Sequence, residues 1–204
     1  MKKAISVNEL LSMRMETLPL EGAWRDAFGE PERHGVWFVW GGSGSGKTTF
    51  VLQLCKELCR FGRVAYDSLE EGACKTMQNA FIRTGMQDVA RRMVLLDCED
   101  MATLSQRLKK RRSPDFVVVD SLQYTQMNYN DFKKLKEAHR DKLLIFISQA
   151  RGTLPSTRVA MSVMYDASLK IWVEGYRAFS KGRTFGEKGY YTVWPERAKK
   201  YWGE

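Results

Sequence analysis

The part of the sequence best suited to chemistry is a glycine-rich run that reads G-G-S-G-S-G-K-T at 41–48. It fits the phosphate-binding loop pattern of Gly, any four residues, Gly, Lys and then Ser or Thr. Small residues let the backbone curl so that successive N–H groups point at phosphate oxygens. In this pattern Lys47 contacts the β- and γ-phosphates of ATP, and the hydroxyl of Thr48 binds Mg²⁺. The residues expected to bind the nucleotide are Gly41, Gly42, Ser43, Gly44, Ser45, Gly46, Lys47, Thr48 and Thr49.

The segments on either side of the loop are apolar and patterned. An apolar run at 36–40 precedes the loop directly, and a helical pattern opens at 50–55. A strand, a loop and a helix in this order form the setting that the motif requires. A flexible Gly/Ser linker is the alternative interpretation, and the order of the flanking elements argues against it.

Asp120 is the candidate second acid of a nucleotide site. It follows four apolar residues at 116–119, a run typical of a strand that is covered on both faces. A carboxylate at the end of such a strand can hold Mg²⁺ beside Thr48. The other interpretation is an ordinary aspartate that caps the next helix.

The carboxylate that orients the attacking water must come from elsewhere, because Ser121 stands where many motor ATPases carry glutamate after this aspartate. Glu70 is the candidate, at the tip of a strand predicted to lie beside the loop strand, and Glu71 could take the role instead. One well-placed carboxylate and one cation can suffice, since phosphoryl transfer depends mostly on positioning and charge stabilisation. A solvent-facing acidic turn is the alternative.

Strand patterns and helical patterns alternate along most of the chain. The predicted strands are 36–40, 63–67, 93–97, 116–120 and 143–149. This alternation predicts an α/β fold with a mostly parallel central sheet flanked by helices.

The last third of the chain has a different character. Residues 151–164 are polar with Gly and Pro, which predicts a long mobile loop. Alternating segments at 168–174, 178–180 and 190–194 predict an antiparallel extension of one sheet edge. The first 34 residues are expected to form a lead-in that packs on the core, and 35–204 to form the main domain.

Composition sets broad limits. The 204 residues fit one domain, and no run approaches the roughly 18 apolar residues of a membrane span. The N-terminus lacks the apolar stretch of a signal peptide, so we expect a cytoplasmic protein without a membrane partner.

Lys and Arg number 33 against 24 Asp and Glu, and the net charge of +9 fits either a polyanionic partner or solubility alone. The four cysteines match no zinc spacing, so neither a metal bound by Cys or His nor a disulfide is expected.

Four segments carry a resemblance to a known family. They are G-G-S-G-S-G-K-T-T-F-V-L-Q at 41–53, Y-D-S-L-E-E at 66–71, V-V-V-D-S-L-Q at 117–123 and I-S-Q-A at 147–150. Together they resemble the RecA-like P-loop ATPases, with the RadA/KaiC branch and the DnaB-type hexameric helicases as the nearest types. The resemblance implies a RecA-type core in which Glu70 is the hydrolytic base and Gln149 senses the γ-phosphate. Without the additional modules of RadA or DnaB, the chain is similar to the compact RecA-like ATPases of phages and prophages.

A basic element lies further downstream, K-G-R-T-F-G at 181–186, and is similar to the K-N-R-F-G motif of RadA. The resemblance implies that Lys181 and Arg183 reach across a subunit interface to the ATP of a neighbour in a homo-oligomer, a ring or a filament. An arginine in that place can raise hydrolysis by about 10³ to 10⁵. A basic β-turn without a partner is the alternative.

The segment after the fifth strand occupies the place of the second DNA-binding loop of RecA-like proteins. The resemblance implies contacts to phosphates of single-stranded DNA, through side chains and backbone N–H groups. The residues expected to make them are Arg151, Thr153, Thr157 and Arg158. The basic run at 109–112 precedes the strand of Asp120, at the end opposite the nucleotide, and is interpreted as a solvated face.

These features predict an ATPase of the RecA fold that couples Mg²⁺-dependent hydrolysis to single-stranded DNA binding in recombination, repair or replication. Three alternatives stay open. A small-molecule kinase would act on a nucleotide acceptor without DNA. An AAA+ helicase loader would need a glutamate after Asp120 and a helical lid, which the sequence does not show. A nucleotide-gated regulatory module would bind the nucleotide and hydrolyse it poorly.

Overall fold

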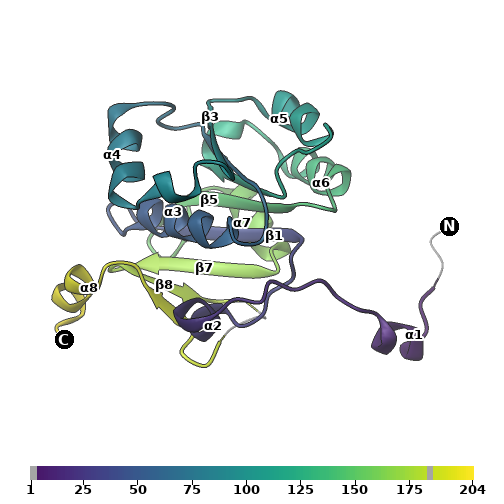
Figure 1. Ribbon diagram of the computed structural model, residues 1–204, viewed down its shortest axis with the longest axis horizontal. Helices are drawn as coiled ribbons and strands as arrows, with labels where there is room; N and C mark the ends of the chain where they lie inside the picture. Colours follow the sequence, from purple (N-terminus) through teal and green to yellow (C-terminus); the bar gives the residue numbers. More distant parts are fainter. Residues whose placement is uncertain (1–3, 183–185) are drawn as a thin grey trace.

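The computed structural model describes residues 4–182 and 186–204. Helices and strands alternate through this part of the chain, as Figure 1 shows. The helices are α1 (Val7–Ser12), α2 (Gly22–Phe28), α3 (Lys47–Leu58), α4 (Lys75–Arg83), η1 (Met86–Val89), α5 (Met101–Leu108), η2 (Leu122–Thr125), α6 (Tyr129–Ala138), α7 (Arg158–Asp166) and α8 (Pro195–Trp202). The strands are β1 (Gly35–Gly41), β2 (Val64–Ser68), β3 (Met93–Asp97), β4 (Phe116–Asp120), β5 (Leu143–Arg151), β6 (Leu154–Pro155), β7 (Leu169–Glu174), β8 (Arg177–Ser180) and β9 (Tyr190–Thr192).

Nine strands form one sheet within the described residues, in the order β3-β2-β4-β5-β1-β7-β8-β9, with β6 paired to β5. The strands from β3 to β7 in that order run parallel to one another. The β8 and β9 strands add antiparallel pairs at the edge beyond β7. The predicted α/β fold with a mostly parallel sheet and an antiparallel C-terminal extension is therefore confirmed.

The central strands are apolar because both of their faces are covered. Trp37 and Val39 of β1 pack into one core with residues of α2, α3 and α4. Val36 and Phe38 of the same strand pack into a second core with residues of α5, α6 and α7. Alternate side chains of a strand point to opposite faces, so a nearly continuous apolar run is needed to fill both cores.

Two expectations about the C-terminal third were wrong in detail. Residues 151–164 are not a long loop, because β5 turns at Gly152 (φ +64°) into the short strand β6 and α7 follows. Thr157 caps α7, its hydroxyl accepting the backbone N–H of Ala160 at 3.1 Å. The first of the three late strands, β7, pairs in parallel with β1 on one side and antiparallel with β8 on the other. The final helix, α8, was not anticipated.

The predicted neighbourhood of Glu70 was also wrong. Its strand, β2, does not lie beside the loop strand, because β4 and β5 stand between β2 and β1. A parallel sheet nevertheless brings the carboxyl ends of all these strands to one edge, and Glu70, which follows β2, lies at that edge.

The N-terminal residues divide into two parts. Leu18, Leu20 and Phe28 are buried in the core that contains α3. By contrast, α1 stands apart from the sheet at the end of an extended segment in Figure 1, and none of its residues is buried. No helix in the described residues has the length and apolar character required to cross a membrane.

Asp67 of β2 is a fully buried acid, and burial raises its pKa to about 6. One carboxylate oxygen accepts the backbone N–H of Glu99 at 3.0 Å, while the other has no hydrogen-bond partner in the described residues.

Since the folded-state pKa of Asp67 lies above the unfolded value, the folded state binds the proton more tightly, and stability should fall as pH rises from about 4 to 6. We expect Asp67→Asn to raise the free energy of unfolding by roughly 1–3 kcal/mol at pH 8 and by much less at pH 4. Denaturant unfolding at both pH values tests this, with the exposed Asp141→Asn as control; an equal gain at both would contradict it.

Candidate nucleotide site

The glycine-rich loop joins the end of β1 to the start of α3. Gly44 (φ +69°) and Gly46 (φ +98°) adopt backbone conformations that favour glycine, and Gly46 is the residue before the first turn of α3. Lys47 folds back over the loop, and its ammonium group donates to the carbonyl oxygens of Gly41 at 2.9 Å and Gly42 at 2.7 Å. Burial lowers the pKa of Lys47, opposed by the nearby carboxylates of Asp120 and Glu70.

The loop fits the phosphates that its sequence predicts. The N-terminus of α3 presents unpaired N–H groups and the positive end of the helix dipole, which together attract anions. The hydroxyl of Ser45 is buried and has no hydrogen-bond partner among the described residues. A phosphate oxygen held by the loop would supply the partner that this hydroxyl lacks.

The tip of the β7–β8 hairpin packs on the loop. Gly175 (φ +52°) and Tyr176 (φ +59°) form a two-residue turn with left-handed backbone at both positions. The Tyr176 N–H donates to the carbonyl oxygen of Ser45 at 3.1 Å, and the Tyr176 ring lies against Gly46. Sequence reasoning missed this brace, although a glycine between two alternating segments was a signal for the turn.

A side chain on Gly46 would be tightly confined by the ring of Tyr176. A methyl group there would lie 3.1 Å from the ring of Tyr176 and would require a left-handed backbone that alanine disfavours. We therefore expect Gly46→Ala to weaken ATP binding by about tenfold or more, because about 1–2 kcal/mol of backbone cost is added to the contact. Gly189→Ala is the matched control, since Gly189 also has a left-handed backbone (φ +70°), has nothing within 4 Å of an added methyl group and lies outside the loop. Fluorescent nucleotide titration measures both; equal affinities would show that the left-handed backbone at Gly46 is not required.

A cluster of aromatic and cationic side chains borders the same cavity of about 470 Å³ as Lys47 and Thr48. The guanidinium of Arg197 lies 4.3 Å from the centre of the Trp194 ring and donates to the Tyr176 hydroxyl at 3.0 Å. Rings and a guanidinium plane are suited to stack on a nucleotide base. Trp194 and Arg197 are candidate base contacts that sequence reasoning missed, because only the folded chain brings α8 to the loop.

Asp120 ends β4, and its carboxylate lies near the ammonium group of Lys47. The Tyr66 hydroxyl donates to its Oδ2, and the peptide bond from Asp120 to Ser121 is cis. Burial raises the pKa of Asp120 to about 6; the Tyr66 hydrogen bond opposes that shift, and the charge of Glu70 adds to it. Asp120 and the Thr48 hydroxyl are oxygen ligands of the kind that Mg²⁺ prefers, and a bound divalent cation would favour the ionised carboxylate.

Glu70 lies between the ends of three neighbouring strands. Its backbone N–H donates to the carbonyl oxygen of Asp120 at 3.2 Å, which fixes it beside β4. Its carboxylate accepts the side-chain amide of Gln149 at 3.1 Å and the hydroxyl of Ser121 at 3.5 Å. The structure thus brings Glu70 and Gln149 together although their strands are separated by β4. Glu71 lines the cavity of Lys47 and Thr48, and its carboxylate accepts the thiol of Cys74 at 3.6 Å.

The residues predicted to contact DNA lie just beyond Gln149. Arg151 ends β5, Thr153 lies in the turn to β6, and Thr157 and Arg158 stand at the start of α7. All four of these residues are exposed. The turn is tied to the sheet, since the Trp40 indole donates to the carbonyl oxygen of Thr153 at 3.0 Å.

The two members of the K-x-R element are placed differently. Arg183 lies outside the described residues. Lys181 follows β8 and lines a second cavity with residues of β7, away from the glycine-rich loop of its own chain.

Comparisons with known proteins bear on the fold. No family model matches the chain, and no curated protein matches it in sequence. Among solved structures, the flagellar accessory protein FlaH from Methanocaldococcus jannaschii superimposes with a TM-score of 0.57 at 14% identity, covering 87% of this chain and 92% of FlaH. A KaiC-like protein from Pyrococcus horikoshii superimposes with a TM-score of 0.58 at 16% identity, covering 79% of this chain and 89% of that protein. With its sheet order and its glycine-rich loop at the end of β1, the chain has the fold of the RecA-like P-loop ATPases.

Proposed function

We propose that the protein binds ATP and Mg²⁺ at the glycine-rich loop and hydrolyses ATP in a manner coupled to single-stranded DNA. The observation that carries the proposal is the contact between the Glu70 carboxylate and the Gln149 amide, 3.1 Å long, at the strand edge that holds Asp120 and Lys47. A base and a γ-phosphate sensor need this arrangement, because both must reach the same water and phosphate.

The proposed chemistry assigns one task to each group. Lys47 neutralises charge on the β- and γ-phosphates, and the loop N–H groups orient them. Glu70 accepts a hydrogen bond from the attacking water and holds it in line with the γ-phosphate. Thr48 and Asp120 would hold Mg²⁺, which supplies charge stabilisation on the phosphate oxygens when bound. Gln149 donates to Glu70, so movement of either side chain is passed to the other.

The route from this site to the proposed DNA segment is short. The backbone N–H of Ser156 donates to the carbonyl oxygen of Gln149 at 3.0 Å. The side-chain amide of Gln123 donates to the hydroxyls of Ser148 at 2.8 Å and Ser156 at 2.7 Å. These hydrogen bonds link Gln149 directly to the segment that carries Arg151 and Arg158, which supports the proposed coupling between nucleotide and DNA.

ATPase rate with and without single-stranded DNA, together with the mass in solution, tests the proposal. Stimulation of hydrolysis by DNA in an oligomer, a ring or a filament, is the expected result. ATP-dependent phosphorylation of a small-molecule acceptor, unaffected by DNA, would instead establish a kinase. Nucleotide binding with negligible turnover under both conditions would favour a regulatory module or a loader.

Salt dependence tests the phosphate contacts separately. We expect affinity for single-stranded DNA to fall steeply with salt, with a log–log slope of about −0.7 for each phosphate contacted. Arg158→Ala should make that slope less steep by about 0.7, because one cation is lost. Lys110→Ala is the control, since Lys110 precedes β4 at the opposite end of the sheet. A slope that does not change in Arg158→Ala would remove Arg158 from the DNA contacts.

A further inference from the structure

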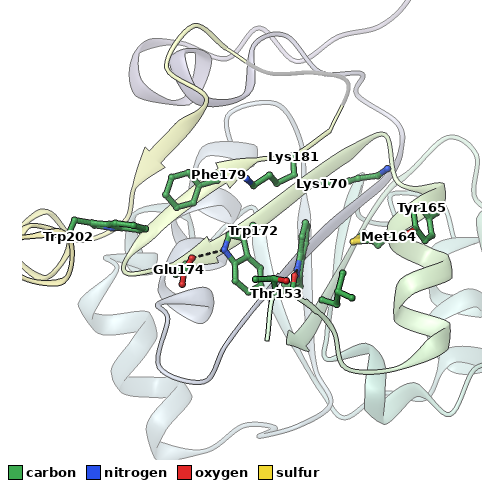
Figure 2. Close-up of a pocket in the computed structure, with 11 residues that line it drawn as sticks. Thr153, Met164, Tyr165, Lys170, Trp172, Glu174, Phe179, Lys181 and Trp202 are labelled. Carbon is green, nitrogen blue, oxygen red and sulfur yellow. Dashed lines mark hydrogen bonds between the residues drawn. The ribbon is translucent and has the colours of Figure 1, made fainter. Parts of the chain in front are cut away.

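A second cavity, of about 590 Å³, lies on the α7 side of β1, β7 and β8. We call it the tryptophan pocket. Among the side chains that line it are Trp40, Trp172, Trp202, Phe179, Lys170 and Lys181. Figure 2 shows Trp202 and Phe179 toward one end of the cavity, Trp172 in the middle, and Lys170 and Tyr165 toward the other end. The volume is that of a small-ligand site, and the mechanism proposed above uses none of these rings.

The rings form a floor and one wall. Trp40 and Trp172, with ring centres 5.5 Å apart, are nearly buried at 6% and 8% exposure and form the floor. Trp202 stands edge-on to Phe179, with ring centres 5.8 Å apart, and keeps 37% of its surface exposed. A partly exposed indole at the mouth of an aromatic cavity offers a stacking surface for a flat ring.

The polar groups of the pocket are few and fixed. The Glu174 carboxylate accepts the indole N–H of Trp172 at 3.0 Å and the hydroxyl of Tyr201 at 3.3 Å. Each of its oxygens keeps capacity for a further donor. Lys170 and Lys181 supply cations at the rim, and the backbone N–H of Lys181 donates to the carbonyl oxygen of Lys170 at 2.7 Å. Aromatic rings, one carboxylate acceptor and two cations fit a nucleobase that bears an amino group and is flanked by phosphates.

The pocket is joined to both functional segments. Trp40 immediately precedes Gly41 of the glycine-rich loop, and its indole donates to the carbonyl oxygen of Thr153 in the proposed DNA segment. Thr153 and Leu154 also line the pocket. A strand of DNA that contacts Arg151 and Arg158 would thus pass the mouth of this cavity.

We propose that the tryptophan pocket receives one unstacked base of single-stranded DNA, stacked on Trp202, with its exocyclic amino group donating to Glu174. This rests on the DNA-binding part of the proposed function. Because thymine has no exocyclic amino group, the pocket prefers cytosine or adenine to thymine. An apolar segment of a second protein chain fits less well, since it would remove the Glu174 carboxylate and two lysine ammonium groups from water and offer them no hydrogen-bond partner of its own.

The test compares the affinity of the full-length protein for fluorescein-labelled oligo(dC) and oligo(dT) of roughly 12 nucleotides, a length within the usual site sizes. Wild type should bind oligo(dC) about fivefold more tightly, the effect of one hydrogen bond. Glu174→Gln should bring that ratio close to one. Trp202→Ala should weaken binding of both oligonucleotides by about tenfold, the effect of one lost stack. Trp202→Phe keeps a ring and should retain most of the affinity, and Lys110→Ala should behave as wild type.

The outcomes separate this proposal from the one on which it rests. Failure of wild type to bind either oligonucleotide overturns DNA binding and the pocket assignment together. Salt-dependent wild-type binding that both Trp202→Ala and Glu174→Gln leave unchanged overturns the pocket assignment alone. A change of mass in Trp202→Ala with DNA affinity intact would identify the pocket as a protein interface. Thermal unfolding of each variant shows whether it is folded. If Trp202→Ala does not fold, the result for Glu174→Gln decides between these outcomes.

Discussion

Glu70→Gln should lower ATP turnover by about two orders of magnitude or more while leaving ATP affinity nearly unchanged, since a positioned base contributes on that scale. The substitution keeps the shape of the side chain, and its carbonyl oxygen can still accept the Gln149 amide that Glu70 accepts at 3.1 Å. What is lost is the negative charge that orients and polarises the water. Single-turnover hydrolysis and nucleotide titration on the same preparation separate the two effects.

Glu71→Gln is the matched control for this experiment. Glu71 is the next residue and lines the cavity of Lys47 and Thr48, but it does not make the contact to Gln149. Normal turnover in Glu71→Gln beside the loss in Glu70→Gln would establish the assignment. The reverse result would transfer the role of base to Glu71, and normal turnover in both variants would leave neither as the base.

Arg183→Ala should reduce hydrolysis by about 10³-fold or more, if an arginine supplied by a neighbouring subunit stabilises the transition state. Mixing Arg183→Ala with Glu70→Gln subunits should then recover activity, because some interfaces combine an intact base with an intact arginine. Steady-state ATPase across a series of mixing ratios measures this. Arg111→Ala, in the basic run before β4, is the control. Absence of recovery at every ratio would mean that each subunit hydrolyses ATP independently.

The sheet could be predicted because its strands are short apolar runs separated by helical patterns. The runs at 93–97 and 116–120 coincide with β3 and β4 as observed. Strand order could not be predicted in the same way, since the side chains of a central strand fill the cores above and below the sheet and carry no mark of which strands lie beside it. Glu70 was therefore assigned to a strand beside β1, whereas β4 and β5 lie between.

Motifs identified the parts of the candidate site that depend on contiguous residues. The loop, Asp120 and Gln149 fall into this class. Tyr176 and Trp194 could not be found in this way, because they are far from the loop in sequence. They reach it only because the β7–β8 hairpin and the start of α8 return to the loop. The prediction of a loop after Gln149 was wrong because Gly and Pro indicate turns, whereas the cap residue Thr157 and the apolar spacing of α7 set a helix directly after them.

The brace between the hairpin tip and the loop joins two main-chain atoms, the N–H of Tyr176 and the carbonyl oxygen of Ser45. Every residue except proline carries that N–H group, so the hydrogen bond itself needs no particular side chain; what it needs is the left-handed turn at Gly175 and Tyr176 that directs the N–H at the loop. Substitutions at partly exposed positions of β8 should therefore leave the loop supported as long as the turn keeps this backbone conformation. The support of the glycine-rich loop thus depends on the shape of a turn distant in sequence and not on the surface of the strands that carry it.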